Sequence, residues 1–258
     1  MNLTADFHTH TTFSHGKGSI LQNARQAKER GLEVLAITDH GYGHRAYGIK
    51  QKKIPYMKEL CSQASAETGV KVLLGVEANI LGLSGKTDMK EADMEFMDVY
   101  LAGVHKFIAY EKLKEWYHLL YRNWRYKNSQ NPPKELVERN TKAYINAIKN
   151  NPIDILAHPG YCCFINAYDV ALCCADYGTY FEIDTRKVHL TDSEWEQVIK
   201  TEVKFVVDSD AHTPENVGLI GEAQSLIERV NIPKDRILNI DGKLPSYFRF
   251  TEYKKKKL

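Results

Sequence analysis

Seven short apolar runs, each rich in β-branched residues, recur along the chain and alternate with segments of helical pattern. Such runs are typical of strands in a parallel sheet that is covered on both faces. Strands alternating with helices imply βα units with right-handed crossovers, and therefore an α/β fold. Seven strands predict a closed or nearly closed barrel, with an open doubly wound sheet as the second interpretation. The predicted strands are residues 3–7, 34–38, 70–76, 99–104, 153–157, 180–183 and 204–207.

Length and charge fit a single domain and argue against a dedicated nucleic-acid binder. The chain has 258 residues, close to the ~250 that a single α/β barrel occupies. No apolar run approaches the ~18 residues of a membrane span, and the first residues do not resemble a signal peptide. The net charge is +2, and because Lys254 to Lys257 supply four positive charges, the rest of the chain carries −2. This balance argues against a dedicated nucleic-acid binder. We expect one domain over residues 1–250 and a solvated basic tail over residues 251–258.

The cysteine pattern indicates a reducing compartment. The five cysteines form two adjacent pairs and one single residue, and no CxxC motif occurs. This pattern is typical of reduced thiols rather than of a disulfide framework. We therefore expect a cytoplasmic protein with no membrane partner.

The segment of residues 106–133 is too long for an ordinary connection between a strand and a helix. Its apolar residues have the spacing of an amphipathic helix, and we expect a helical insertion there. In one interpretation the aromatic face packs onto the barrel. In the other the insertion is a lid, with the cations of its opposite face turned toward an anionic substrate. The apolar positions are Leu113, Trp116, Tyr117, Leu120, Tyr121 and Trp124.

Histidines and acidic residues lie at or just after the ends of the predicted strands. In a parallel barrel all carboxyl ends of strands share one face, where active sites form. Residues i and i+2 of a strand point the same way, so His8 with His10 and Asp210 with His212 are natural chelating pairs. The candidate metal ligands are His8, His10, His15, His40, Glu77, His105, His158, Asp210 and His212.

Imidazole and carboxylate ligands without thiolate favour Zn, Mn or Fe(II). At roughly three or four protein ligands per catalytic ion, this set suits two to three divalent ions. A carboxylate such as Glu77 can bridge two ions, which a neutral imidazole ordinarily does not.

The sequence resembles the PHP (polymerase and histidinol phosphatase) family, and looks closest to its compact stand-alone members with a trinuclear metal centre. The resemblance covers residues 6–212. Its segments stand in the family's order: His8-Thr-His10, Thr38-Asp-His40, Gly75-Val-Glu77, Gly103-Val-His105, His158-Pro-Gly160 and Ser209-Asp-Ala-His212.

The resemblance implies a distorted (β/α)7 barrel, similar to a TIM barrel, and a phosphoesterase with its metal site at the carboxyl ends of the strands. It also implies a partition of the ligands. One ion would take His8, His10, Glu77 and Asp210. A second would take Glu77, His105 and His158, and a third His15, His40 and His212. The aromatic insertion is longer than is expected of the compact members, which bears on substrate selection.

Three residues are candidates for catalysis. Clustered divalent ions neutralise a phosphate ester and lower the pKa of bound water, so that a metal-activated hydroxide attacks phosphorus. Glu77 would bridge two ions. Asp39 is expected to orient an imidazole rather than to bind metal. Arg186, after the sixth strand, either binds the phosphate through paired N–H groups or makes a surface salt bridge.

The first functional hypothesis is a metal-dependent phosphatase for a small phosphomonoester, with histidinol phosphate or a related metabolite among the candidates by resemblance. The alternative is a phosphodiesterase or 3′–5′ exonuclease, which only Arg122, Arg125 and the lysine tail favour. A non-catalytic domain that keeps metal for stability is the third. The sequence does not indicate an oligomeric state.

Overall fold

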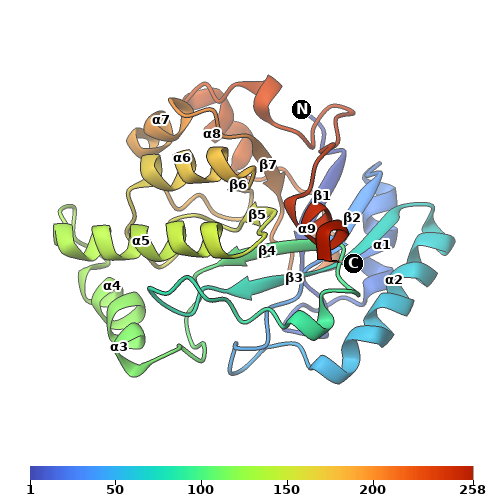
Figure 1. The fold of residues 1–258 in the computed structure, drawn as a ribbon. Coiled ribbons are helices and arrows are strands. Elements are labelled where there is room, and N and C mark those ends of the chain that lie inside the picture. Colours follow the sequence, from blue (N-terminus) through green and yellow to red (C-terminus); the bar gives the residue numbers. More distant parts are fainter. Residues whose placement is uncertain (258) are drawn as a thin grey trace.

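The predicted α/β barrel is confirmed in a computed structural model, which describes residues 1–257. Within these residues, seven parallel strands form one sheet in the order of the sequence (Figure 1). The open doubly wound sheet is not observed. The strands are β1 (Ala5–Thr9), β2 (Val34–Ile37), β3 (Lys71–Asn79), β4 (Val99–Gly103), β5 (Ile155–Leu156), β6 (Tyr180–Asp184) and β7 (Phe205–Asp208).

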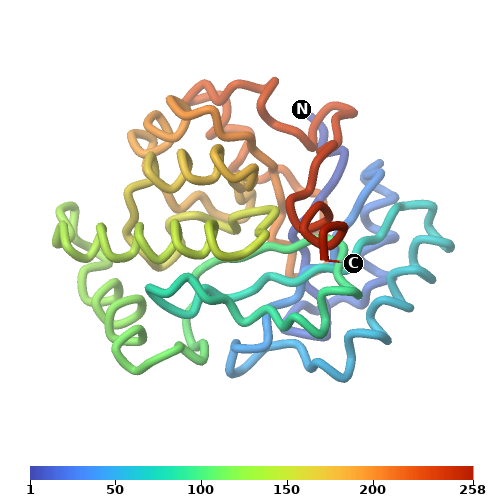
Figure 2. Tube along the Cα trace, viewed as in Figure 1, coloured from blue at the N-terminus to red at the C-terminus, as the bar shows by residue number. Residues whose placement is uncertain are grey.

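The barrel is nearly closed where β7 returns to β1. Thr9 pairs with Ala211 in a parallel bridge. Asn239 lies across the same seam: its Nδ2 donates to the carbonyl oxygens of Ala5 (2.9 Å) and Val207 (2.7 Å). The start of the chain therefore runs beside the segment around Asn239 (Figure 2), where Leu3 pairs with Ile240.

Helices cover the outside of the sheet (Figure 1). Capping boxes are present at Ser19 with Gln22 and at Thr191 with Glu194, where side chains satisfy the free N–H groups of the first helical turn. The helices that follow the strands are α1 (Ile20–Glu29), α2 (Ile54–Thr68), α5 (Lys134–Asn150), α6 (Ala167–Tyr177), α7 (Asp192–Ile199) and α8 (Ala223–Arg229).

Two apolar cores hold the sheet. The larger core lies between the strands and the helices. The smaller one combines alternate residues of different strands, including Phe7, Leu101 and Tyr180, and therefore fills the inside of the barrel. The ring of Phe248 packs edge-on against that of Phe7, with 5.5 Å between the ring centroids, and covers this inner core. At the carboxyl ends of the strands, polar side chains fill the barrel instead.

Strand β5 is shorter than the predicted run of residues 153–157. Asp154 lies inside that run and is fully buried. Its carboxylate accepts hydrogen bonds from the backbone N–H groups of Tyr100 (2.9 Å) and Phe250 (2.7 Å). A side chain thus takes the place of part of the strand ladder.

The insertion after β4 is helical, but its aromatic side chains are not packed onto the barrel. It consists of α3 (Leu113–Trp116), a π-helical segment η3 (Tyr117–Arg122) and α4 (Asn123–Tyr126). The buried positions are Glu115, Leu119 and Asn123, whereas Trp124 is 57% exposed. Polar contacts anchor the buried side, because Arg139 donates to Glu115 (3.0 Å) and Asn140 to Asn123 (2.9 Å). The expectation of an aromatic packing face is therefore wrong.

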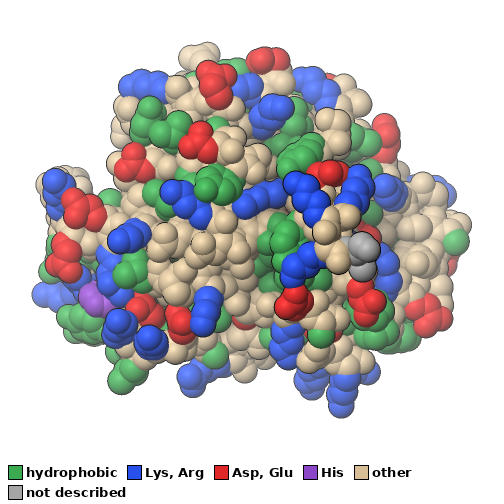
Figure 3. Space-filling model, viewed as in Figure 1, with side chains coloured by type: hydrophobic (Ala, Val, Ile, Leu, Met, Phe, Trp, Pro, Cys, Tyr) green, Lys and Arg blue, Asp and Glu red, His purple; other side chains and the backbone are tan. Residues whose placement is uncertain are grey.

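The lysine-rich end forms a helix in the described residues, and its last lysines, Lys255 to Lys257, are exposed. Residues Arg249–Lys257 form helix α9, in which Phe250 is fully buried. Lys254 donates to the carbonyl oxygen of Met97, and Lys257 pairs with Glu91. Figure 3 shows Lys and Arg side chains gathered around this helix. Leu258 lies outside the described residues.

In the part of the chain that the structure describes, no helix combines the length and the apolar character that crossing a membrane requires.

Candidate metal centre

An irregularity in β1 turns the first two histidines toward the mouth of the barrel. The pairing of β1 with β2 shifts register between Asp6 and Thr9. Phe7 still faces the apolar interior, but beyond the shift His8 and His10 contact the other polar side chains of the mouth. A bulge of this kind re-aims side chains and is common near functional sites. Both imidazoles are completely buried.

Glu77 lies at the centre of the cluster. β3 extends beyond its predicted end and places this residue within the strand rather than after it. Glu77 Oε1 lies 2.6 Å from His158 Nε2, 2.7 Å from His105 Nε2 and 3.3 Å from His8 Nε2. Glu77 Oε2 lies 2.6 Å from His40 Nδ1. One buried carboxylate therefore contacts imidazoles from four different segments.

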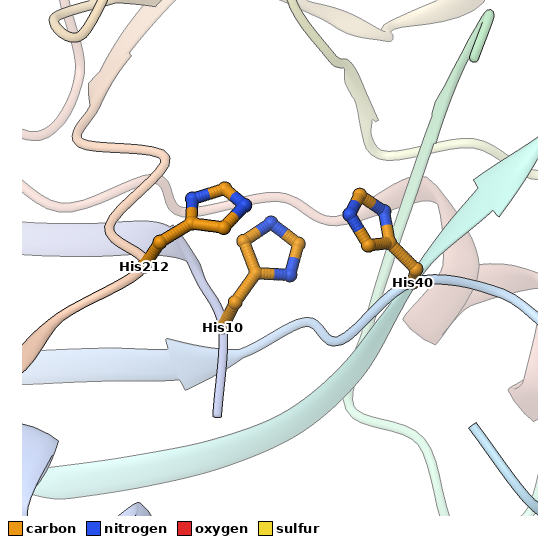
Figure 4. A group of neighbouring side chains, drawn as sticks. All are labelled: His10, His40 and His212. Carbon is orange, nitrogen blue, oxygen red and sulfur yellow. The ribbon is translucent and has the colours of Figure 1, made fainter. Parts of the chain in front are cut away.

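The remaining candidate ligands complete a second part of the cluster. His10 Nε2 lies 3.0 Å from Asp210 Oδ1 and 3.2 Å from His8 Nε2. Figure 4 shows the rings of His10, His40 and His212 turned toward one another from the segments after β1, β2 and β7. The ring centroid of His10 lies 4.5 Å from that of His40 and 4.4 Å from that of His212.

Every candidate ligand except His15 belongs to a set of three whose donor atoms lie within 4.8 Å of one another. His15 is nevertheless adjacent, with its ring centroid 4.2 Å from that of His212 and 4.7 Å from that of His40. The structure thus groups His40 and His212 with His10, whereas the family resemblance groups them with His15. The four sets are His10, His40 and His212; His8, His10 and Asp210; His8, Glu77 and His158; and His40, Glu77 and His105.

The donor atoms fit divalent cations. His40 Nδ1 and Glu77 Oε2 are in contact at 2.6 Å, yet among the described residues neither atom has a hydrogen-bond partner. Buried polar atoms are rarely left without a partner, because desolvation then costs about 1–3 kcal/mol. Converging lone pairs of imidazole and carboxylate are the ligands that Zn²⁺, Mn²⁺ and Fe²⁺ accept.

The carboxylates of the cluster are held in the ionised form. Burial alone would raise the pKa of Glu77, but the neighbouring imidazoles of His105, His8 and His40 hold it well below its usual range. Burial and the hydrogen bond with His10 oppose each other in the same way at Asp210, whose pKa is also well below its usual range. Ionised carboxylates are the form that binds metal.

The pKa values of the imidazoles differ from one another. Burial lowers the pKa of His105 to about 4, and burial together with His212 and His40 lowers that of His15 to about 3. Burial also acts on His8 and His158, but Glu182 and Glu77 raise the pKa of His8, and Glu77 raises that of His158 to about 9. At these two rings a proton therefore competes with any cation for the imidazole lone pair.

Glu182 is a residue of the site that the sequence pattern did not reveal. It is completely buried in β6. Its Oε1 lies 2.7 Å from Nδ1 of His8, and its other oxygen accepts a hydrogen bond from the backbone N–H of His158. A carboxylate that alternates with Asp184 along an otherwise apolar strand was the available signal.

Asp39 does not orient an imidazole by a hydrogen bond, contrary to the expectation. Its carboxylate accepts from the N–H and hydroxyl of Thr11 (2.7 and 2.6 Å) and from the hydroxyl of Ser14. It therefore fixes the loop that leads to His15. The physical reason is the depth of Asp39, which is fully buried beneath that loop.

Arg186 reaches the mouth of the barrel. Its Nη1 donates to Asp210 Oδ2 (2.9 Å) and lies 3.1 Å from His212 Nδ1. The side chain remains 57% exposed. Arg186 therefore forms a salt bridge and also lies at the edge of the cluster. The expected salt bridge thus does not exclude the expected binding of phosphate.

Comparison with known proteins agrees with this geometry. The family model for the PHP domain matches residues 6–200. The chain belongs to the PHP domain family. This PHP domain protein is 32% identical to a probable phosphatase of Thermoanaerobacter sp. (strain X514), over 96% of each chain. It is 34% identical to a probable phosphatase of Caldanaerobacter subterraneus subsp. tengcongensis, over 93% of this chain and 88% of the relative.

A solved structure shows the same fold. Histidinol phosphate phosphatase from Lactococcus lactis subsp. lactis, complexed with Zn, L-histidinol and phosphate, superposes with a TM-score of 0.61 at 18% identity. The match covers 89% of the PHP domain protein and 94% of the relative. At this identity the likeness concerns the distorted (β/α)7 barrel.

Proposed function

We propose that this protein is a metal-dependent phosphatase that hydrolyses a small phosphomonoester. The observation that carries the proposal is the position of Glu77, a fully buried carboxylate in contact with imidazoles of four segments at the carboxyl ends of parallel strands. The probable phosphatases that match nearly the whole chain support it.

The proposed centre holds two to three divalent ions of Zn, Mn or Fe. When bound, such ions neutralise phosphate oxygens and lower the pKa of water toward about 7. Glu77 would be shared between two ions, and Asp210 would bind one. The proposed ligands are His8, His10, His15, His40, Glu77, His105, His158, Asp210 and His212.

Arg186 would bind the phosphate group of the substrate. Its guanidinium lies beside Asp210 and is half-exposed, so N–H groups that face solvent remain able to donate to phosphate oxygens. Glu182 would keep His8 oriented, and Asp39 would keep the loop before His15 in place. The chain thus supplies binding, orientation and charge at one mouth of the barrel.

Histidinol phosphate is one candidate substrate, because a protein of the same fold was crystallised with L-histidinol and phosphate. A phosphodiesterase or exonuclease has less support. Arg122 of the insertion pairs with Glu135 (3.3 Å), and Lys254 and Lys257 are engaged with other parts of the fold. Three of the cations that would attract a nucleic acid are thus already engaged within the fold, whereas Arg125 and Lys256 are exposed. We also propose a cytoplasmic location, which the five unpaired cysteines support.

The test is hydrolysis of p-nitrophenyl phosphate and of bis(p-nitrophenyl) phosphate, with Mn²⁺ or Zn²⁺ supplied. Glu77→Gln is the negative control, with circular dichroism to show that it folds. Faster release from the monoester that depends on Glu77 is the expected result. Preference for the bis-ester would replace the proposal by a phosphodiesterase. Bound metal without hydrolysis of either ester, or of histidinol phosphate, would favour a structural centre.

A further inference from the structure

A cleft of about 1290 Å³ lies beside the proposed metal centre. One wall is the insertion after β4, with Trp116, Tyr121 and Trp124. The opposite wall consists of residues 160–165, after β5, and residues 187–191, after β6. None of the proposed metal ligands lines it. The insertion therefore lines a cleft that is separate from the proposed ligands.

Tyr161 connects the cleft with the centre. It lines the cleft, and its ring centroid lies 5.0 Å from that of His158 and 6.3 Å from that of His105, both proposed ligands. His189 also lines the cleft, and its ring centroid lies 4.9 Å from that of Tyr161. Tyr161 therefore borders both the cleft and the proposed centre, and an ester held at the centre would enter the cleft beside this ring.

The insertion presents flat aromatic surfaces that its own packing does not use. Trp116 is 42% exposed and Trp124 57% exposed, although both line the cleft. The ring of Tyr121 lies between them, 6.0 Å from each, and is stacked on Trp116 at an interplanar angle of 25°. Polar contacts of Glu115 and Asn123 anchor the insertion. Exposed aromatic faces of this kind bind planar groups by stacking.

The charge of the cleft is positive. Lys106, Lys127 and Lys187 line it, whereas Glu194 is the single acidic residue among its lining residues. Lys106 also lies over the ring of Tyr161, 5.7 Å from its centroid, at the passage to the centre. Three ammonium groups against one carboxylate favour a ligand with negative charge in addition to the phosphate that is cleaved.

The volume argues for a large ligand. Clefts that bind drug-sized molecules measure roughly 300–1,000 Å³, and this one is larger. A small aliphatic alcohol would leave most of the aromatic wall in contact with water.

We propose that the cleft binds the alcohol part of a phosphomonoester, and that this alcohol carries a planar ring system and a further anionic group. The inference rests on the proposed phosphatase function and narrows its substrate class. Trp116, Tyr121 and Trp124 supply the stacking surface. Lys106, Lys127 and Lys187 supply the charge for the second anionic group.

The test measures the hydrolysis of phenyl phosphate, 2-naphthyl phosphate and 6-carboxy-2-naphthyl phosphate by the full chain, with Mn²⁺ or Zn²⁺ supplied. The expected kcat/KM rises from the first to the third ester, by about tenfold for the second ring. Trp124→Ala should abolish the gain from the second ring, and Lys127→Gln should reduce the gain from the carboxylate. Tyr168→Ala and Lys114→Gln are control variants, because Tyr168 is an exposed aromatic residue of α6, Lys114 is an exposed lysine of the insertion, and neither lines the cleft.

Two outcomes separate this inference from the proposed function. Equal kcat/KM for the three esters, or an equal loss in Tyr168→Ala and Trp124→Ala, would overturn the substrate class and leave the phosphatase intact. A calorimetric titration with 6-hydroxy-2-naphthoate, which needs no turnover, measures the cleft alone. Binding that Trp124→Ala weakens, without hydrolysis of any ester, would support the cleft as a ligand site and overturn the phosphatase.

Discussion

Glu182 Oε1 lies 2.7 Å from Nδ1 of His8, and both side chains are completely buried beneath the proposed metal centre. Nε2 of the same ring lies 3.3 Å from Oε1 of Glu77. With a cation bound, the contact with Glu182 would keep the ring proton on Nδ1 and leave the lone pair of Nε2 for the metal. A carboxylate behind an imidazole raises the basicity of the ring and fixes its orientation. The same carboxylate accepts a hydrogen bond from the backbone of His158 and so supports two proposed ligands at once.

The substitution Glu182→Gln should weaken metal binding by roughly 10- to 100-fold, because the amide holds His8 without its negative charge. Competition with a chelating dye measures the affinity. At saturating metal the kcat should largely recover, since Glu182 positions a ligand and does not contact substrate. Glu228→Gln, at an exposed position of α8, is the control. An unchanged metal affinity in Glu182→Gln would contradict the positioning role.

Glu77→Gln should remove two metal equivalents per chain, whereas Asp210→Asn should remove one. The reason is that Glu77 is common to two sets of donor atoms, and Asp210 belongs to one. Elemental analysis of the purified variants measures the difference directly. Loss of the same number of ions from both variants would show that Glu77 does not bridge.

Arg186→Lys should raise KM for a phosphomonoester by roughly 10- to 100-fold, because a charged hydrogen bond contributes about 1.5–3 kcal/mol and lysine lacks the planar pair of donors. The metal content should stay the same, which elemental analysis checks. A normal KM would mean that Arg186 serves only as the ion-pair partner of Asp210.

Asp154 should make the free energy of unfolding depend on pH. Burial raises its pKa to about 7 in the folded chain, above the 3.8 expected for an unfolded one. Between about pH 4 and pH 7 the folded state therefore binds more protons, so the contribution of this group to stability falls as the pH rises through that window and levels off above it. Asp154→Asn should flatten the change in Tm between pH 5 and pH 8, with the exposed Asp235→Asn as control. Parallel curves for the variant and the natural chain would refute the assignment.

The sequence was sufficient for the barrel and for the meeting of its polar side chains, because parallel topology brings the carboxyl ends of strands to one face. His10 and Asp210 could be placed at the same mouth in this way although 200 residues separate them, and the family resemblance assigned them to one ion. The partners beneath the ligands could not be predicted. Glu182 meets His8 because of the register shift in β1. Asp39 accepts hydrogen bonds from Thr11 because it is buried beneath the loop at that residue.

The insertion shows the limit of a periodic pattern. Regular helical spacing predicted an aromatic contact face, but the segment contains a π-helical stretch and is anchored through Glu115 and Asn123. Buried polar anchors do not appear in a hydrophobic pattern. Helix α9 is a similar case, because Phe250 alone provides its buried contact and lysines otherwise dominate its sequence.

The seam closed by Asn239 has a consequence for how the cell makes an active protein. During synthesis His10 appears 200 residues before Asp210, and the bridge from Asn239 to Ala5 and Val207 forms only after that. Until the end of β7 docks beside β1, the histidines of β1 lack the carboxylate of Asp210. The metal centre, as proposed, would therefore be complete only after this seam has closed.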